Sequence, residues 1–398
     1  MAASTGARSV LGVFATALKL GLTSFGGPIA HLGYFRREYV ERRGWLDERA
    51  FADLVALCQL LPGPASSQLG IAIGTRRAGL SGGIAAWLGF TLPSALVLIG
   101  FALVAGSADL ASAGWVHGLK LAAVAVVAQA VLLMAVALAP DWPRRIVAVA
   151  AAVVVLLVST PLTQVAVIVG GAIVGYLVLR APPADDVPEP APVSTRAGIA
   201  LLVVFATLLL GLPLLAGATE SAPLAQVDAF YRSGSLVFGG GHVVLPLLNT
   251  AVVEPGWVGQ DQFLAGYGAA QAVPGPLFTF AAYLGAVSIV PPGGWLGGAV
   301  CLGAIFLPSF LLVWGVLPFW TRLRGSASFR RALAGTGAAV VGLLAAALYN
   351  PVWIGNVSGV TDIAIAAAAL GLLFARVPPI VVVALCALGG QAVTIWRI

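Results

Sequence analysis

The chain has 398 residues, of which 60% are hydrophobic and 9% charged, and its mean hydropathy is +1.01. Soluble domains carry about 25% charged residues, so this composition excludes a soluble globular protein. The formal net charge is +6, but the Lys and Arg residues stand in short groups beside apolar runs rather than in a basic stripe. That pattern argues against nucleic-acid binding and is typical of the loop charges of a membrane protein.

Apolar runs of the length needed for membrane helices recur along the whole chain, one crossing requiring roughly 20 residues. The first run continues into polar residues without a small-residue cleavage site, so we interpret it as a retained membrane helix. We expect an all-α polytopic protein with about 12 to 13 membrane segments. The runs are 10–30, 84–106, 116–139, 146–179, 198–215, 296–319, 332–348 and 363–387.

The first expected membrane helix ends in a glycine-rich break. Ser24, Gly26 and Gly27 lie at this break, where glycines allow a ligand to approach the backbone, although they also serve helix packing. Lys19 stands inside the apolar run. A charge near the bilayer centre costs about 2.5 to 3.5 kcal/mol on insertion scales, so we interpret Lys19 as a substrate-binding cation. The alternative is that Lys19 snorkels to the membrane surface.

The segment Pro62-Gly63-Pro64 interrupts the next apolar stretch. Proline stops one helix and Pro64 suits the first turn of another, so a helix is expected to begin inside the membrane. A helix N-terminus carries unpaired N–H groups and about half a positive charge, which makes an anion site without a metal. Side chains that add donors or satisfy freed backbone groups here are Gln59, Ser66, Ser67 and Gln68.

A change of composition divides the chain. Residues 181–196 are rich in Pro, Asp and Glu, which form neither a membrane helix nor a packed core. We expect an N-terminal membrane repeat at 1–180, a linker at 181–196 and a C-terminal membrane repeat at 197–398. The apolar run 198–215 has no counterpart in the first repeat, and the sequence does not settle how often the chain crosses between the repeats.

The second half repeats the motifs of the first at an almost constant offset of 212 to 215 residues. Paired breaks at corresponding positions of two halves are the best sequence sign of a transporter's binding site. The pairs are Phe25-Gly26-Gly27 with Phe238-Gly239-Gly240, Gln59 with Gln271, Pro62-Gly63-Pro64 with Pro274-Gly275-Pro276, and Leu92-Pro93-Ser94 with Leu307-Pro308-Ser309. The substrate-binding candidates of the second half are Arg232, Gly239, Gly240, Gly241, His242, Gln271, Pro274, Gly275, Pro276 and Thr279.

Arg232 stands six residues before Phe238, as Lys19 does before Phe25. Two cations that point inward would match a dianion, whereas a pair between Arg232 and Asp228 at an interface is the alternative. The three His and three Cys residues have no metal-like spacing, so we expect neither a metal site nor a cofactor.

The distribution of arginine predicts how the two halves are oriented. The loop after the first break carries five arginines, whereas the corresponding segment 243–262 has neither Lys nor Arg. By the positive-inside rule the first loop is cytoplasmic and the second external. This predicts inverted repeats, with each Pro-Gly-Pro segment as a re-entrant hairpin or a full crossing. The arginines are Arg36, Arg37, Arg42, Arg43 and Arg49.

In this order the motifs resemble those of the chromate ion transporter family: FGGP followed by a His and an arginine-rich loop, LPGP, FGGGH and VPGP. The chain is similar to the long members, which carry a tandem duplication. The resemblance covers nearly the whole chain. It implies chromate export that confers resistance, in the inner membrane of a bacterium, with the isosteric sulfate as a further substrate.

We therefore expect a secondary transporter that exports chromate. A dianion leaving a negatively charged cytoplasm gains about 2.3 kcal/mol per charge per 100 mV, and the chain has no GxxxxGK[ST] phosphate loop. The alternative is uptake of sulfate or another oxyanion coupled to cations. A membrane-embedded enzyme is a remote alternative, because neither HExxH nor GxSxG occurs. Expected partners are the anion and the lipid bilayer, with no nucleic acid, and a homodimer stays open.

Overall fold

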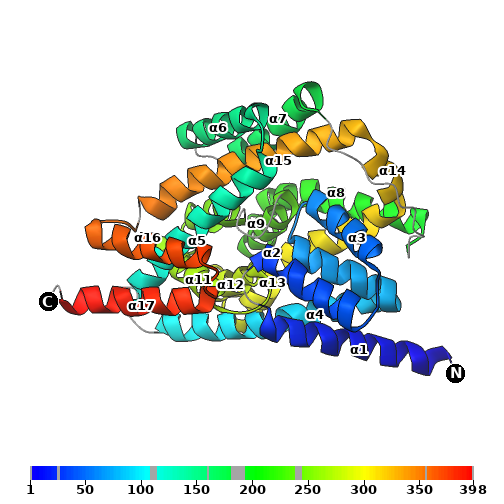
Figure 1. Ribbon diagram of the computed structural model, residues 1–398, viewed down its shortest axis with the longest axis horizontal. Helices are drawn as coiled ribbons and strands as arrows, with labels where there is room; N and C mark the ends of the chain where they lie inside the picture. The colour runs from blue at the N-terminus through cyan, green and yellow to red at the C-terminus, as the bar shows by residue number, and fades with distance from the viewer. Residues whose placement is uncertain are drawn as a thin grey trace.

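The computed structural model describes residues 2–24, 27–107, 114–158, 161–180, 193–237, 244–354 and 356–396. These residues form helices joined by short turns and contain no strand, which confirms the predicted all-α class. Figure 1 shows an elongated bundle whose two termini lie at opposite ends of its long axis.

The described residues of the first half form seven α-helices and one π-helical segment, η1. Side chains cap several of them; Asp47, for example, accepts a hydrogen bond from the backbone N–H of Ala50 at 2.8 Å where α3 begins. The elements are α1 (Ala2–Thr23), α2 (Gly27–Phe35), η1 (Arg36–Arg42), α3 (Glu48–Leu60), α4 (Ala65–Ser107), α5 (Gly114–Leu138), α6 (Trp142–Leu157) and α7 (Pro161–Val178).

The second half begins with α8, and Ser194 caps this helix from inside the predicted linker. Linker residues 181–192 lie outside the described part of the chain. The elements are α8 (Thr195–Thr219), α9 (Ala222–Leu236), α10 (Val244–Leu248), η4 (Asn249–Val253), α11 (Gln260–Ala272), η5 (Leu277–Thr279), α12 (Phe280–Val287), α13 (Gly294–Val316), η6 (Leu317–Phe319), α14 (Trp320–Gly325), α15 (Ala327–Ala347), η7 (Leu348–Trp353), α16 (Val360–Phe374) and α17 (Pro379–Trp396).

Five of the described helices are long and apolar enough to cross a membrane, which makes the chain a multi-pass membrane protein. The expected count of crossings includes shorter helices and stays a prediction. The five stretches are Ala65–Val104, Gly114–Val136, Thr195–Thr219, Gly294–Phe319 and Ala327–Asn350.

The helices around the two Pro-Gly-Pro segments are too short to cross. Helices α3 and α11, which precede these segments, have 13 residues each, whereas a crossing requires about 20. After the first segment, α4 continues only to a kink at Ala78 and Gly79. Each Pro-Gly-Pro segment is therefore the tip of a short helical hairpin.

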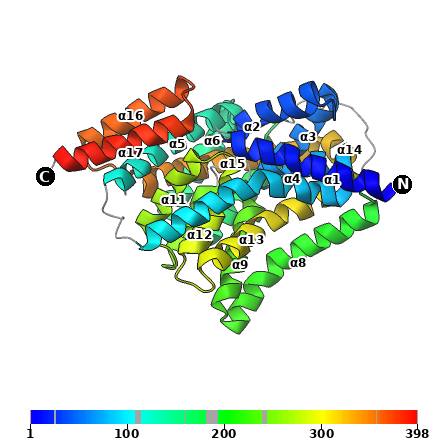
Figure 2. The ribbon, with the colours of Figure 1, turned by 90° about the horizontal axis from the view of Figure 1, so that it is seen from below.

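The order of elements from α1 to α7 recurs from α9 to α17, which accounts for the unmatched apolar run 198–215. This run lies in α8, which has no equivalent in the first repeat. Helix α8 packs against α9 and α13 and is mostly exposed, as expected of a helix that faces lipid. Figure 2 shows it along one edge of the bundle.

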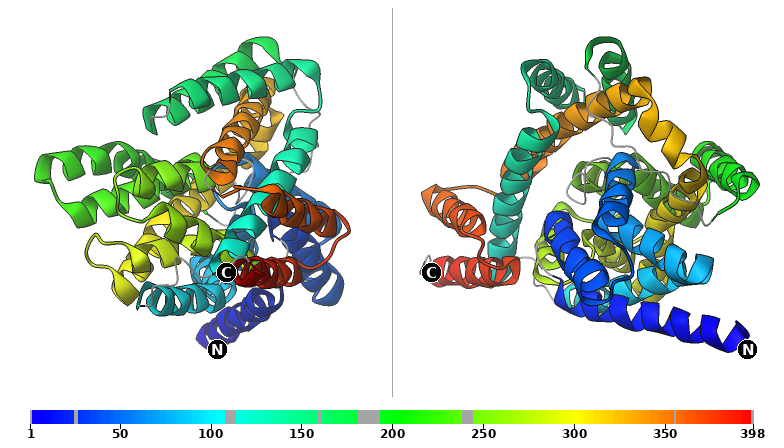
Figure 3. Two further views of the ribbon diagram at one scale, coloured as in Figure 1. Left: turned by 90° about the vertical axis from the view of Figure 1, so that its left-hand side faces the viewer. Right: turned by 45° about the vertical axis from the view of Figure 1, so that its right-hand side comes forward.

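The two repeats exchange their terminal helices. Helix α5 of the first repeat packs against α16 and α17 of the second, and α15 of the second packs against α6 and α7 of the first. Small residues permit these contacts: Gly118 lies against Gly390, and Gly335 against Gly171. Figure 3 shows α6 and α7 against α15 at the top of the bundle, and α16 and α17 against the lower end of α5. The halves are repeats in sequence but not separate bundles in space.

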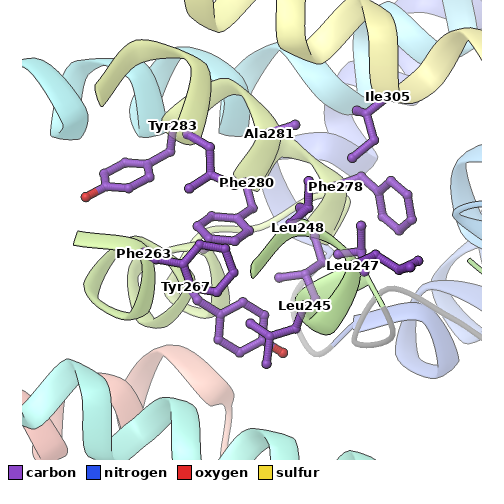
Figure 4. Close-up of a cluster of buried hydrophobic side chains, with 14 of the residues drawn as sticks. Leu245, Leu247, Leu248, Phe263, Tyr267, Phe278, Phe280, Ala281, Tyr283 and Ile305 are labelled. Carbon is purple, nitrogen blue, oxygen red and sulfur yellow. The ribbon is translucent and has the colours of Figure 1, made fainter. Parts of the chain in front are cut away.

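An aromatic core fixes the second hairpin. Phe280 lies at the start of α12, and its ring is 5.1 Å from the ring of Phe263 and 5.7 Å from that of Tyr267, both in α11. Figure 4 shows this cluster together with leucines from α10. In the first repeat, Phe90 of α4 holds α2 in a similar way, with ring distances of 5.1 Å to Phe35 and 5.2 Å to His31. Both breaks therefore stand on rigid supports.

Candidate functional site

The two Pro-Gly-Pro tips meet the helix ends of the opposite repeat, at the residues that precede the glycine-rich motifs. The N–H of Gly63 donates to the carbonyl of Val237 at 2.6 Å, and the N–H of Gly275 donates to the carbonyl of Ser24 at 3.0 Å. Ser24 and Val237 are equivalent positions, as are Gly63 and Gly275. A contact that is exchanged reciprocally between equivalent positions indicates an approximate two-fold relation between the repeats. We call this place the central crossing.

The repeated Leu-Pro-Ser motifs also reach the central crossing. A Cβ atom added at Gly63 would lie 2.9 Å from the hydroxyl of Ser309, and one added at Gly275 would lie 2.8 Å from the hydroxyl of Ser94. The φ angles of +124° at Gly63 and +104° at Gly275 are also values that favour glycine. These two positions therefore require glycine both for the turn and for the close approach of the opposite repeat.

Buried hydroxyl groups lie on the elements that form the crossing. Ser67 lies in the first turn of α4, Ser24 at the end of α1, and Ser309 against Gly63. These three hydroxyls and that of Thr91 are buried, with no hydrogen-bond partner among the described residues. Buried hydroxyls normally find a partner, so a group of them in one place is typical of a site that awaits a ligand.

Sequence reasoning missed Thr91, Ser94 and Ser309. The repeat of Leu-Pro-Ser marked Ser94 and Ser309 as equivalent, but the motif lies some 30 residues after each hairpin tip. Only packing of α4 against η5 and of α13 against α4 brings these serines to the tips. Symmetric recurrence of a polar residue beside a proline inside an apolar run was the available signal.

His31 joins two of the breaks in the first repeat. Its Nε2 lies 3.2 Å from the carbonyl of Ser24, and its Nδ1 lies 3.2 Å from the hydroxyl of Ser66. Because a carbonyl only accepts, Nε2 carries the proton, and Nδ1 accepts from Ser66. The hydroxyl of Ser66 is thus committed to His31, whereas that of Ser67 stays available.

Gln68 supports the tip of the first hairpin. Its side-chain N–H donates to the carbonyl of Pro62 at 2.7 Å, while its amide oxygen is buried and lacks a partner among the described residues. Pro64 is buried and Pro62 is half-buried. The first turn of α4 thereby directs its N–H groups toward the crossing, where a negative charge is favoured.

The second hairpin repeats the backbone but not the side chains. Thr279 is equivalent to Ser67, yet its hydroxyl donates to the carbonyl of Pro276 at 2.7 Å. Buried Phe278 and Phe280 stand where the first repeat has Ser66 and Gln68. The polar groups at the crossing therefore come mainly from the first hairpin.

The remaining predicted residues lie around the crossing or outside the described chain. Gln59 is exposed and lines a pocket of about 430 Å³ with Arg36 and Glu48. Gln271 bonds to Tyr267 through its side chain. Pro274 is half-buried and Pro276 buried, and Gly27 is the first residue of α2. Gly26, Gly239, Gly240, Gly241 and His242 lie outside the described residues.

The two predicted cations each have a carboxylate partner. Nζ of Lys19 lies 2.8 Å from Oε2 of Glu38, and the Lys19 side chain is 46% exposed. Arg42 and Arg43 also bind Glu38, at 3.2 Å and 2.8 Å. Lys19 thus belongs to a network of charges centred on Glu38 in the arginine-rich segment.

Arg232 pairs with Asp228, which was the alternative expected for this residue. Nη2 of Arg232 lies 2.6 Å from Oδ2 of Asp228, one helical turn earlier in α9. The Asp228 side chain is 5% exposed and that of Arg232 is 42% exposed. The two cations therefore do not form a matched pair aimed at the crossing.

Comparison with known proteins agrees with this architecture. The family model described as chromate transporter matches residues 11–176 and 224–391, one match for each repeat. The chromate transport protein of Pseudomonas aeruginosa is 30% identical to the chain, over 84% of the chain and 79% of the relative.

Two further relatives show similar coverage. The chromate transport protein of Cupriavidus metallidurans is 28% identical over 83% of the chain and 80% of its own length. An uncharacterized transporter of Methanocaldococcus jannaschii is 25% identical over 85% of the chain and 83% of its own length. No solved structure matches. Because the family model matches both repeats over most of the chain, the protein belongs to the chromate transporter family.

Proposed function

We propose that the protein exports chromate across the inner membrane, and that the anion binds at the central crossing between the repeats. The observation that carries this proposal is the reciprocal meeting of the two hairpin tips, with buried hydroxyls that have no partner among the described residues. A tetrahedral dianion presents acceptor oxygens on every side, which suits hydroxyl donors and the N-terminus of α4.

Export agrees with the electrostatics of the membrane. A dianion that leaves a negative cytoplasm gains about 2.3 kcal/mol per charge per 100 mV. The arginine-rich segment around η1 would attract anions from the cytoplasm, provided that it faces that side. Cysteine labelling at Arg37 and at Gly256, in a protein whose three native cysteines are replaced, should place the two positions on opposite faces. Labelling of both from one side would contradict the inverted arrangement.

Chromate flux in proteoliposomes tests the proposed site. The variants Ser67→Ala and Ser309→Ala each remove one donor without a steric clash. Each should weaken chromate binding by about 1 to 2 kcal/mol, that is roughly 5- to 30-fold. The matched control is Ser81→Ala, because the Ser81 hydroxyl is exposed and bonds only to its own helix. Wild-type flux in both site variants would contradict binding at the crossing.

Sulfate is the competing substrate in the same assay. Sulfate and chromate are both tetrahedral dianions, so charge does not distinguish them. Selectivity between them depends on their size and hydration. In inside-out vesicles the cytoplasmic face points outward, so export appears as uptake of external chromate. This uptake, measured under an imposed membrane potential, gives the direction of transport. Accumulation of sulfate but not chromate, in right-side-out vesicles with a cation gradient, would support cation-coupled uptake instead.

A further inference from the structure

A cavity of about 430 Å³ lies in the second repeat beside α9, the helix that leads to the central crossing. Leu236, at the end of α9, lines the cavity, and the next residue, Val237, accepts the hydrogen bond from Gly63. The cavity therefore extends to within about one helical turn of the crossing. Its polar lining consists of Asp228, Arg232, Ser233, Thr250 and Glu254.

The ion pair in this cavity is only partly satisfied. Arg232 contacts Asp228 through a single N–H at 2.6 Å rather than through the two-pronged arrangement that guanidinium and carboxylate favour. Oδ1 of Asp228 and Nε of Arg232 are buried and have no hydrogen-bond partner among the described residues. Each ion thus keeps unused hydrogen-bonding capacity beside an open volume.

Few other charges act on this pair. Glu254 is the other charged residue among the described lining, and its side chain is exposed. The neighbouring elements α7, α10, η4 and α13 contain no charged residue. Helix α8 carries Arg196 near its N-terminus, far from α9, and is followed by exposed Glu220 in the turn before α9. Asp228 therefore depends on Arg232 for its counter-charge.

We propose that this cavity is a proton-linked anion site, in which a tetrahedral oxyanion and the Asp228 carboxylate compete for Arg232. The inference rests on the proposed function, since the anion is the one that is transported. Two oxygens of the anion occupy the guanidinium fork, and Asp228 loses its partner. A buried carboxylate without a counter-charge is unfavourable, so Asp228 takes up one proton from water in the cavity. When the anion leaves, Asp228 returns the proton to water and pairs again with Arg232.

The equivalent cation of the first repeat, Lys19, does not form such a device. If an anion displaced Lys19 from Glu38, the carboxylate would keep Arg42 and Arg43 as partners. Glu38 would then stay ionised without a proton. The proton link is therefore a property of the second repeat alone.

Proton uptake on anion binding tests the inference. Sodium sulfate or sodium chromate is added to the purified full-length protein in weakly buffered detergent solution, at alkaline pH where both anions are fully ionised. A pH indicator should report uptake that approaches one proton per anion bound. Asp228→Asn should take up none, and it should bind the anion more tightly because the competing carboxylate is gone. Glu220→Gln, which removes an exposed charge outside the cavity, should behave as the wild type does.

Two results would overturn the inference: no proton uptake by the wild type with either anion, or undiminished uptake in folded Asp228→Asn. If Asp228→Asn does not fold, sulfate affinity of the wild type decides, because a one-proton link requires affinity to rise as pH falls, by at most about tenfold per pH unit. A sulfate affinity that does not change with pH would contradict the link between anion binding and proton uptake. These measurements need binding but not flux, so loss of transport with intact proton uptake would contradict only the proposed function.

Discussion

The two repeats place a cation at the same position of the helix that leads to the crossing, but they surround it differently. Lys19 shares Glu38 with two arginines on an exposed segment. Arg232 has a single carboxylate, Asp228, and both line a cavity. An equivalent position in a duplicated sequence therefore need not keep an equivalent role, because the partners come from residues that have diverged.

The hairpin tips show the same division. Their backbone contacts are reciprocal, while the first turn after the tip is polar in one repeat and aromatic in the other. Duplication has kept the scaffold on which both halves depend. Divergence has given the first hairpin most of the polar groups and the second repeat the cavity with the ion pair. The predictions below test this division, beginning with the shared scaffold.

The largest effects are expected from Gly63→Ala and Gly275→Ala. Each adds a Cβ to a residue with positive φ, within 2.9 Å of a serine hydroxyl of the other repeat. Each should lower the free energy of unfolding by about 2 to 4 kcal/mol and reduce chromate flux strongly. Thermal melting and flux per inserted protein measure both effects. Gly303→Ala is the control, because a Cβ there meets open space. If one glycine variant behaves as this control does, the two repeats do not depend equally on their hairpin tips.

The next effect separates the two cations. Arg232→Met leaves Asp228 buried without its counter-charge. This should destabilise the protein by about 2 to 3 kcal/mol, less than the loss of a fully buried pair, because the Arg232 side chain is 42% exposed. Lys19→Met leaves Glu38 with Arg42 and Arg43, so the loss should stay below about 1 kcal/mol.

Flux measurements complete this comparison. Lys19→Met should keep at least half of the wild-type chromate flux, since a lysine that pairs with Glu38 contributes little to the site. Loss of flux in Lys19→Met with unchanged melting would instead return Lys19 to the binding site. Equal melting of the two variants would contradict the difference between the repeats.

Glu38 should give an intermediate effect that depends on pH. Burial raises the pKa of Glu38, but hydrogen bonds from Lys19 and Arg43 outweigh burial and hold the pKa at about 2. A lowered carboxyl pKa stabilises the folded protein above the ordinary value of 4.5, and that stability is lost as pH falls toward 2. Glu38→Gln should cost about 2 kcal/mol at neutral pH and flatten the dependence of melting on acid pH. An unchanged pH profile would show that the network contributes nothing.

The smallest effect is expected from Thr279→Val. The Thr279 hydroxyl is already committed to Pro276, so its loss should cost about 1 kcal/mol of stability and little chromate affinity. Ser67→Ala, at the equivalent position, should reduce affinity more. Chromate binding to the two variants, measured side by side, sharpens the comparison between the hairpins. A larger loss of affinity in Thr279→Val would place the anion nearer to the second hairpin.

The sequence alone determined the membrane class, the all-α fold and the duplication with its broken helices. These features are local: apolar length sets a membrane helix, and proline or glycine ends it wherever the segment lies. Recurrence of Pro62-Gly63-Pro64 as Pro274-Gly275-Pro276 was readable because both copies keep the same backbone requirement. The family resemblance followed from the order of these motifs, and the matches to both repeats confirm it.

Only the tertiary structure decided which side chains meet. The reciprocal bonds of Gly63 and Gly275 each join the two repeats, across more than 170 positions of sequence. Ser309 likewise reaches the first hairpin only because α13 packs there. The partners of Lys19 and Arg232 depended in the same way on which acidic residue folding brings near. Hydropathy and spacing describe one segment at a time, whereas pairing, burial and unused hydrogen-bonding capacity arise from contacts between segments.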